Sequence, residues 1–145
     1  MEKAEEFYKR AIEADPKHAN TLGNYAQLCF LRNRCDEGIQ LLKRAELLNP
    51  QNQELQVELA FYHLAHDPEA WPDGLKKMAE LFASGGRSPG WDLDSNVAVA
   101  LEAGHPNPEL LGAIAAVIAK GEHLESLARF PEWPSAPNAN RKTKK

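Results

Sequence analysis

A phrase that returns after 34 residues constrains the fold of this chain more than any other feature of its sequence. Residues 9–16 read KRAIEADP and residues 43–50 read KRAELLNP. The same shift of 34 places residues of one physical type on each other elsewhere, in the pairs Ala4–Gly38, Tyr8–Leu42, Tyr25–Leu59, Ala26–Ala60 and Pro16–Pro50. A fixed period of this length is typical of a repeat array, in which each unit stacks on its neighbours.

The spacing of apolar residues predicts that the repeating units are helical. Apolar positions recur at intervals of three and four, which indicates helices with one buried stripe. We expect helices over residues 2–14, 19–32, 36–48, 53–66 and 72–83. Pro16 and Pro50 end the first and third, because proline cannot continue the helical hydrogen-bond ladder.

The second half of the chain follows the pattern more loosely. The stretch SGGRSPG at 84–90 predicts a flexible connection. Helices are expected near 92–103 and 107–120, the latter capped by Asn107 with Pro108 in its first turn, and a short one at 122–129. No segment reads as a strand. The fold class predicted is therefore all-α.

Composition excludes several classes of function. The net charge of −4 gives no basic face for nucleic acid. No apolar run approaches the roughly 20 residues that cross a bilayer, so no membrane contact is expected. Two cysteines do not make a disulfide framework, and the N-terminus lacks the apolar run of a secretory signal, so a cytoplasmic location is predicted.

The sequence contains no pattern that predicts catalysis, a cofactor or a metal. His63 and His66 lie three residues apart on one helix, but they belong to no recognised ligand spacing together with Cys29 and Cys35. No nucleophile lies in a catalytic signature, and the carboxylates are spread over helix surfaces. The chain is expected not to be an enzyme.

Two helices per 34 residues, with small residues at Ala26, Gly38 and Ala45 and a closing Pro50, resemble the tetratricopeptide repeat. Residues 19–52 match a complete unit, 2–18 the second helix of a preceding unit, and 53–83 a further unit. The resemblance implies a right-handed superhelical solenoid of antiparallel helix pairs. Residues 91–130 are interpreted as a diverged unit and cap. Residues 131–145 are interpreted as a disordered tail, because they have too little apolar content to pack.

Members of this family are, as a rule, non-catalytic scaffolds that bind a peptide or a partner-protein segment in a concave groove lined by the first helix of each unit. Carried over by position, the resemblance assigns this groove to Asn20, Asn24, Gln27, Glu54, Glu58 and Asn96, with Phe61 beside Glu58. Asn24, Glu58 and Asn96 occupy matching places, so an asparagine ladder would be interrupted by the glutamate. Ordinary solvated polar residues are the alternative for each position.

The charges in this groove indicate which ligand it would accept. Glu54 and Glu58 stand where a carboxylate-binding groove would need cations. An acidic ligand would meet like charge, so a neutral or basic segment is expected.

The missing first helix of the first unit leads to a second hypothesis. Phe7 and Ile12 would be partly exposed on helix 2–14, and an exposed apolar face tends to become an interface. Either two chains pair through this end as a homodimer, or the chain is a stacking or capping segment of a larger repeat array or multidomain enzyme.

Overall fold

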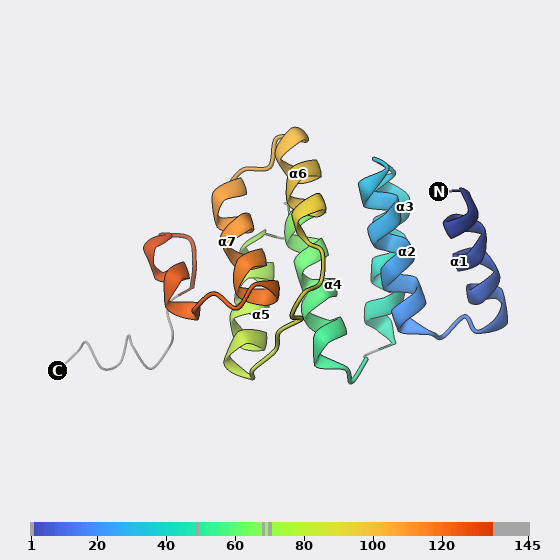
Figure 1. Cartoon of the computed structure of the whole chain (residues 1–145), viewed down its shortest axis with the longest axis horizontal. Helices are drawn as coiled ribbons and strands as arrows, with labels where there is room; N and C mark the ends of the chain where they lie inside the picture. Colours follow the sequence, from blue (N-terminus) through green and yellow to red (C-terminus); the bar gives the residue numbers. More distant parts are fainter. Residues whose placement is uncertain (1, 49, 68, 70, 135–145) are drawn as a thin grey trace.

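A computed structural model describes residues 2–48, 50–67, 69 and 71–134, and within these residues every regular element is a helix (Figure 1). The helices are α1 (Glu2–Ala14), α2 (Ala19–Leu31), α3 (Cys35–Leu47), α4 (Gln53–His66), α5 (Trp71–Ala83), α6 (Asp94–Glu102) and α7 (Pro108–Ala119), followed by the 3-10 helix η2 (Leu124–Arg129). The all-α class is confirmed. The right-handed superhelical arrangement of the helix pairs stays a prediction.

Local sequence explains where the helices begin. Asn52 and Asn107 each accept a hydrogen bond from a backbone N–H three residues on, at 3.2 Å, which caps α4 and α7. His18 caps α2 in the same way through its Nδ1 atom. The expected bounds of the first five helices agree with the structure to within one residue at each end.

A glycine lets α2 and α3 cross closely. A Cβ atom added to Gly38 would lie 2.7 Å from the ring of Phe30, which is closer than side-chain atoms approach. Ala26 and Ala45 are both fully buried. The expectation that small residues mark the crossing points is confirmed.

Helix α4 lies at the centre of the molecule. It packs against α2, α3, α5, α6 and α7, and ten of its residues are buried. Phe61, which the repeat register assigned to an open groove, is 0 % exposed. That expectation was wrong, because the neighbours of α4 enclose this part of the helix and leave mainly its first turn exposed.

Helix α6 lies across α2 and α4 as well as packing on α7. The helix pair 94–119 therefore folds back over the first helices of the two preceding units, and α6 occupies part of the face that those helices share (Figure 1). In a regular repeat array, the first helix of the next unit would pack only against the unit before it. The face shared by α2 and α4 would then stay open.

The packed part of the chain extends beyond residue 130. The carboxylate of Glu132 accepts hydrogen bonds from Trp71 Nε1, at 3.2 Å, and from the amide of Asn107. The ring of Trp133 lies 5.8 Å from that of Phe82. The prediction of a disordered tail from residue 131 onward is therefore wrong for residues 131–134. One tryptophan and one carboxylate are enough to dock this segment. Residues 135–145, with the basic RKTKK, lie outside the described residues.

None of the helices described is both long and apolar enough to cross a membrane.

Candidate functional site

The six residues assigned to the concave face fall into two groups. Asn20 and Glu54 are exposed, and Asn24 and Gln27 are half-buried. Glu58 is 7 % exposed and Asn96 is 0 % exposed. The first half of the face is thus open, whereas the second half is covered.

A buried polar cluster holds α6 over the covered half. Gln27 Nε2 on α2 donates to Asn96 Oδ1 at 2.8 Å and to the backbone oxygen of Asp92 at 3.0 Å. Asn96 Nδ2 lies 2.8 Å from His66 Nε2 on α4, so it donates to the ring of a neutral histidine. Burial lowers the pKa of His66 to about 4, with a smaller contribution from His105. One asparagine thereby joins α2, α4 and α6.

The connection between α5 and α6 is also fixed to α4. Ser88 Oγ donates to Glu58 Oε2 at 2.6 Å, and Trp91 Nε1 donates to Tyr62 Oη at 2.9 Å. The backbone N–H of Ser88 donates to the carbonyl of Ile118 at 3.0 Å. The prediction of a flexible connection was wrong, because these polar groups bond to α4 and α7.

Burial raises the pKa of Glu58, and the carboxylate of Glu54 raises it further, although the bond from Ser88 acts in the opposite direction. Glu58 therefore holds the α5–α6 connection rather than presenting a free carboxylate to solvent.

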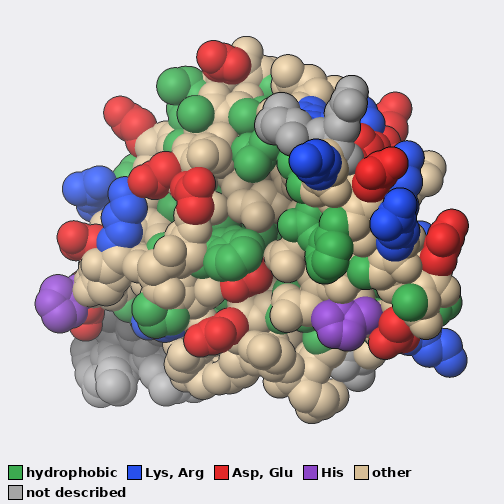
Figure 2. Space-filling view, turned by 45° about the vertical axis from the view of Figure 1, so that its right-hand side comes forward, with side chains coloured by type: hydrophobic (Ala, Val, Ile, Leu, Met, Phe, Trp, Pro, Cys, Tyr) green, Lys and Arg blue, Asp and Glu red, His purple; other side chains and the backbone are tan. Residues whose placement is uncertain are grey.

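The open half of the face assigned by the repeat register carries polar side chains that are accessible to solvent. Within the described residues, no hydrogen bond or ion pair engages the side chains of Asn20, Asn24 or Glu54. Figure 2, turned toward the α1 end, shows apolar side chains gathered in the middle of the surface and charged side chains mostly around them.

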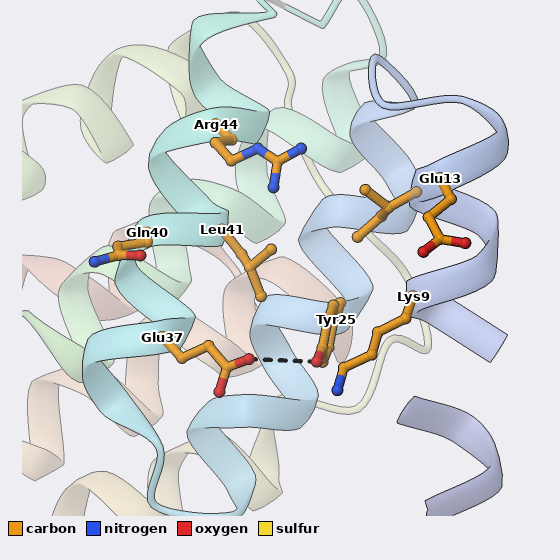
Figure 3. A pocket seen from close by; sticks show the side chains of 8 residues that line it. Lys9, Glu13, Tyr25, Glu37, Gln40, Leu41 and Arg44 are labelled. Atoms are coloured by element: carbon orange, nitrogen blue, oxygen red, sulfur yellow. Dashed lines mark hydrogen bonds between the residues drawn. The ribbon is translucent and has the colours of Figure 1, made fainter. Parts of the chain in front are cut away.

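A hollow lies between α1 and α3, beside Tyr25 of α2 (Figure 3). It measures about 390 Å³. Its floor is apolar, formed by Ile12, Leu41 and the ring of Tyr25, whose hydroxyl oxygen lies 3.3 Å from a carboxylate oxygen of Glu37. Lys9 and Glu13 border it on one side, and Glu37, Gln40 and Arg44 on the other. Its rim has equal numbers of positive and negative groups, so it offers no charge preference.

Helix α1 is covered on one side only. It packs against α2, where Tyr8 stacks on Tyr25 with ring centroids 5.6 Å apart. Phe7 on the other side is 66 % exposed, and Ile12 is half-buried in the hollow of Figure 3. The expectation of a partly exposed apolar end is confirmed for both residues. Whether two chains pair there stays a prediction.

Glu5, for which the sequence pattern predicts no role, fixes α1 to the next unit. Its carboxylate accepts hydrogen bonds from Arg34, at 2.7 Å, and from the hydroxyl of Tyr25, at 3.0 Å, and these contacts lower the pKa of Glu5. Arg32 adds a longer contact at 3.4 Å. The 34-residue period could not reveal this cluster, because Glu5 corresponds to Ile39 in the next unit.

The histidines bind protein groups. His63 Nδ1 lies 2.8 Å from a carboxylate oxygen of Glu46, and His66 contacts Asn96. Among the residues that the structure describes, no three histidine, cysteine or carboxylate side chains form a group that could hold a metal ion.

Comparison with known proteins agrees with the repeat in the first part of the chain. Residues 1–59 match the family model described as tetratricopeptide repeat. No curated protein and no solved structure matches the chain.

Proposed function

Because residues 1–59 carry a tetratricopeptide repeat, a motif that generally mediates protein–protein interaction, we propose that this chain is a non-catalytic scaffold that binds a partner segment on the open half of its concave face. The ligand is a peptide or an exposed segment of a partner protein. It contacts Asn20, Asn24 and Glu54, beside the edge of α6. The observation that carries the proposal is the contrast between these unpartnered side chains and the covered Glu58 and Asn96.

The asparagines supply groups for backbone recognition. A side-chain amide both donates and accepts, so Asn24 can pair with a peptide N–H and a peptide C=O together. Helices α2 and α4 hold these side chains on a rigid support, which reduces the entropy lost on binding. Gln27 and Asn96 contribute indirectly, since their mutual bond positions α6 along the edge of the open half.

The charges near this surface favour a neutral or basic segment. Glu54 lies close enough to Glu58 to raise its pKa, and Glu58 and Asp92 both contribute to the raised pKa of Tyr62, whose main cause is burial. The exposed carboxylate of Glu54 therefore gives this surface a negative field. A lysine or arginine in the ligand gains from this field, whereas an acidic residue loses.

Selection from a displayed library of random peptides tests the proposal. Enriched peptides are expected to be rich in lysine or arginine and poor in aspartate and glutamate. Their affinity, measured by fluorescence anisotropy, is expected to fall at least about tenfold in Asn24→Ala with Glu54→Lys, the loss of a few polar contacts. The matched control is Lys76→Glu, an exposed charge change on α5. Peptides that bind the double variant as tightly as the wild type would contradict the proposal.

The uncovered side of α1 favours a second candidate function, in which the chain associates through its N-terminal end. An exposed phenylalanine on a firmly anchored helix is typical of an interface. Homodimer formation is one form of this function, and stacking on another array or enzyme domain is the other. Sedimentation equilibrium of the wild type and of Phe7→Glu distinguishes them: only a homodimer changes mass with concentration in the absence of other proteins.

A further inference from the structure

The outer face of α1, defined here as Ala4, Phe7, Ala11 and Ala14, is an apolar surface on an anchored helix. Ala4, Phe7 and Ala14 are exposed and Ala11 is half-buried. Phe7 is among the three large apolar side chains described as exposed, and its neighbours on this face are alanines. The Phe7 ring protrudes between small residues. A second helix can therefore pack around the ring and approach the backbone of α1 closely at the alanines.

Two of the three positive side chains of α1, Lys3 and Arg10, lie along one border of this face. At about 100° per residue, Lys3 and Arg10 lie roughly 60–80° from the centre of the outer face, whereas Glu6 and Glu13 lie roughly 120–140° away. Both cations are exposed, and within the described residues neither forms an ion pair. The other border, with Tyr8 and Ile12, is closed by packing on α2.

The negative charge of α1 nearest to that closed border is already engaged. Glu5 binds Arg34 and Tyr25, and also lies 3.7 Å from Lys9. The outer face therefore presents apolar groups with cations on its single open border, and the anchoring by Glu5 holds it in place before a partner arrives.

A helix is the element that fits this surface. The backbone N–H and C=O groups in the middle of α1 are used within the helix, so the face offers no ladder for a strand. The residues at spacings of three and four form a ridge along the helix, which packs against the ridges of a second helix.

A second copy of the chain fits less well. A two-fold axis sets the same patch against itself, and in an antiparallel pair Lys3 and Arg10 would face the same two cations of the second copy. Like charges at the border of an interface oppose association.

From these contacts and charges we propose that the outer face of α1 binds an amphipathic helix of another protein, which has acidic residues along the border that meets Lys3 and Arg10. The inference rests on the interaction role proposed above, but not on the concave face. Phe7 supplies the apolar anchor, and the two cations select the partner and its orientation.

Two synthetic amphipathic helical peptides of equal length test this inference. Both have the same leucine and alanine face; one has a border of glutamates and the other a border of lysines. By fluorescence anisotropy with the full chain at low salt, the glutamate peptide is expected to bind roughly three- to tenfold more tightly, the effect of one or two exposed ion pairs. Lys3→Glu with Arg10→Glu is expected to reverse that order, and Phe7→Glu to abolish the binding of both peptides.

The controls separate a specific border from a general charge effect. Lys76→Glu with Lys77→Glu makes the same change in net charge on the exposed surface of α5, and Leu101→Glu removes another exposed apolar residue. Both are expected to leave the preference intact, as is Glu54→Lys on the concave face. Circular dichroism checks that each variant is folded.

Three outcomes overturn the inference. The first is that neither peptide binds, or that both bind with equal affinity. The second is that the Lys76 and Lys77 variant reverses the preference as the α1 variant does. The third is that the wild type forms a dimer which Phe7→Glu dissociates, because the second copy then occupies the face. Loss of concave-face peptide binding in the earlier experiment leaves all three readouts unaffected, so the two proposals fail independently.

Discussion

Gln27 on α2 donates a hydrogen bond of 2.8 Å to the side-chain oxygen of Asn96 on α6, although the two residues are 69 positions apart in sequence. Asn96 is completely buried and also contacts His66. The first complete helix pair and the last one are therefore joined through a polar group inside the protein. Such a bond is costly to leave unmade, because the buried side chain of Asn96 cannot turn to water.

Replacement of Asn96 by leucine is expected to lower the free energy of unfolding by about 1–3 kcal/mol, since the buried His66 loses its partner and Gln27 loses one of its two hydrogen bonds. Urea denaturation followed by tryptophan fluorescence measures the change. The control is Asn20→Ala, at an exposed position, which is expected to alter stability by no more than about 0.5 kcal/mol. Equal effects of the two substitutions would contradict the importance of the buried cluster.

His66 is expected to make the fold less stable as the pH falls. Its pKa is about 4 in the folded chain against 6.5 for an ordinary histidine, so the unfolded chain binds a proton first. The stability that neutral His66 confers is complete above pH 6.5 and is lost as the pH falls toward 4, by up to roughly 3 kcal/mol.

Unfolding free energies measured between pH 7 and pH 4 test this prediction. This range spans the pKa of His66 in the unfolded chain, 6.5, and in the folded chain, about 4. The variant His66→Gln is expected to show a shallower decline than the wild type. His123→Gln, at an exposed position, serves as the matched control and should follow the wild type. A parallel decline in wild type and His66→Gln would assign the pH dependence to other groups.

Two glycine substitutions are expected to have opposite effects. Gly38→Ala places a methyl group against the Phe30 ring and is expected to destabilise the fold by about 1–3 kcal/mol. Gly112→Ala, inside α7, meets only a methyl of Val97 at 4.0 Å and is expected to stabilise the fold by up to about 1 kcal/mol through helix propensity. Thermal unfolding compares the two, and a stabilised Gly38→Ala would show that α2 and α3 can separate without loss.

Glu58→Gln is expected to raise the unfolding midpoint at neutral pH. Burial raises the pKa of the Glu58 carboxyl, so ionisation of this group disfavours the folded state as the pH rises through that pKa. Glutamine removes the charge and keeps an oxygen that accepts the hydrogen bond from Ser88. Glu54→Gln, on the exposed part of the same helix, should change the midpoint little, and a lower midpoint for Glu58→Gln would contradict the prediction.

The repeat period was sufficient to predict the first part of the fold. Each of the first five helices has an apolar stripe of its own, and prolines or capping residues mark the boundaries. The local sequence therefore determines where each helix begins and ends. The bounds of α1 and α4 agree with the prediction at both ends. The exposure of Phe7 was predicted as well, because the register makes residues 2–14 the second helix of a unit.

The position of α6 could not be predicted in the same way. The repeat register places Asn96 in a groove. In the structure, Asn96 instead forms hydrogen bonds with His66, 30 positions away, and with Gln27, 69 positions away. Nothing in the local pattern of Gln27, His66 or Asn96 marks them as mutual partners. The docking of Glu132 and Trp133 escaped prediction for a similar reason, because a single long-range contact leaves no periodic signal.

The return of α6 across α2 and α4, together with the packing of residues 131–134 near Trp71 and Phe82, makes the two ends of the described part of the chain different. The α1 end presents a helix with one uncovered side, whereas residues 131–134 pack against helices at the opposite end (Figure 1). A partner that recognises the surface of one end therefore does not find the same surface at the other.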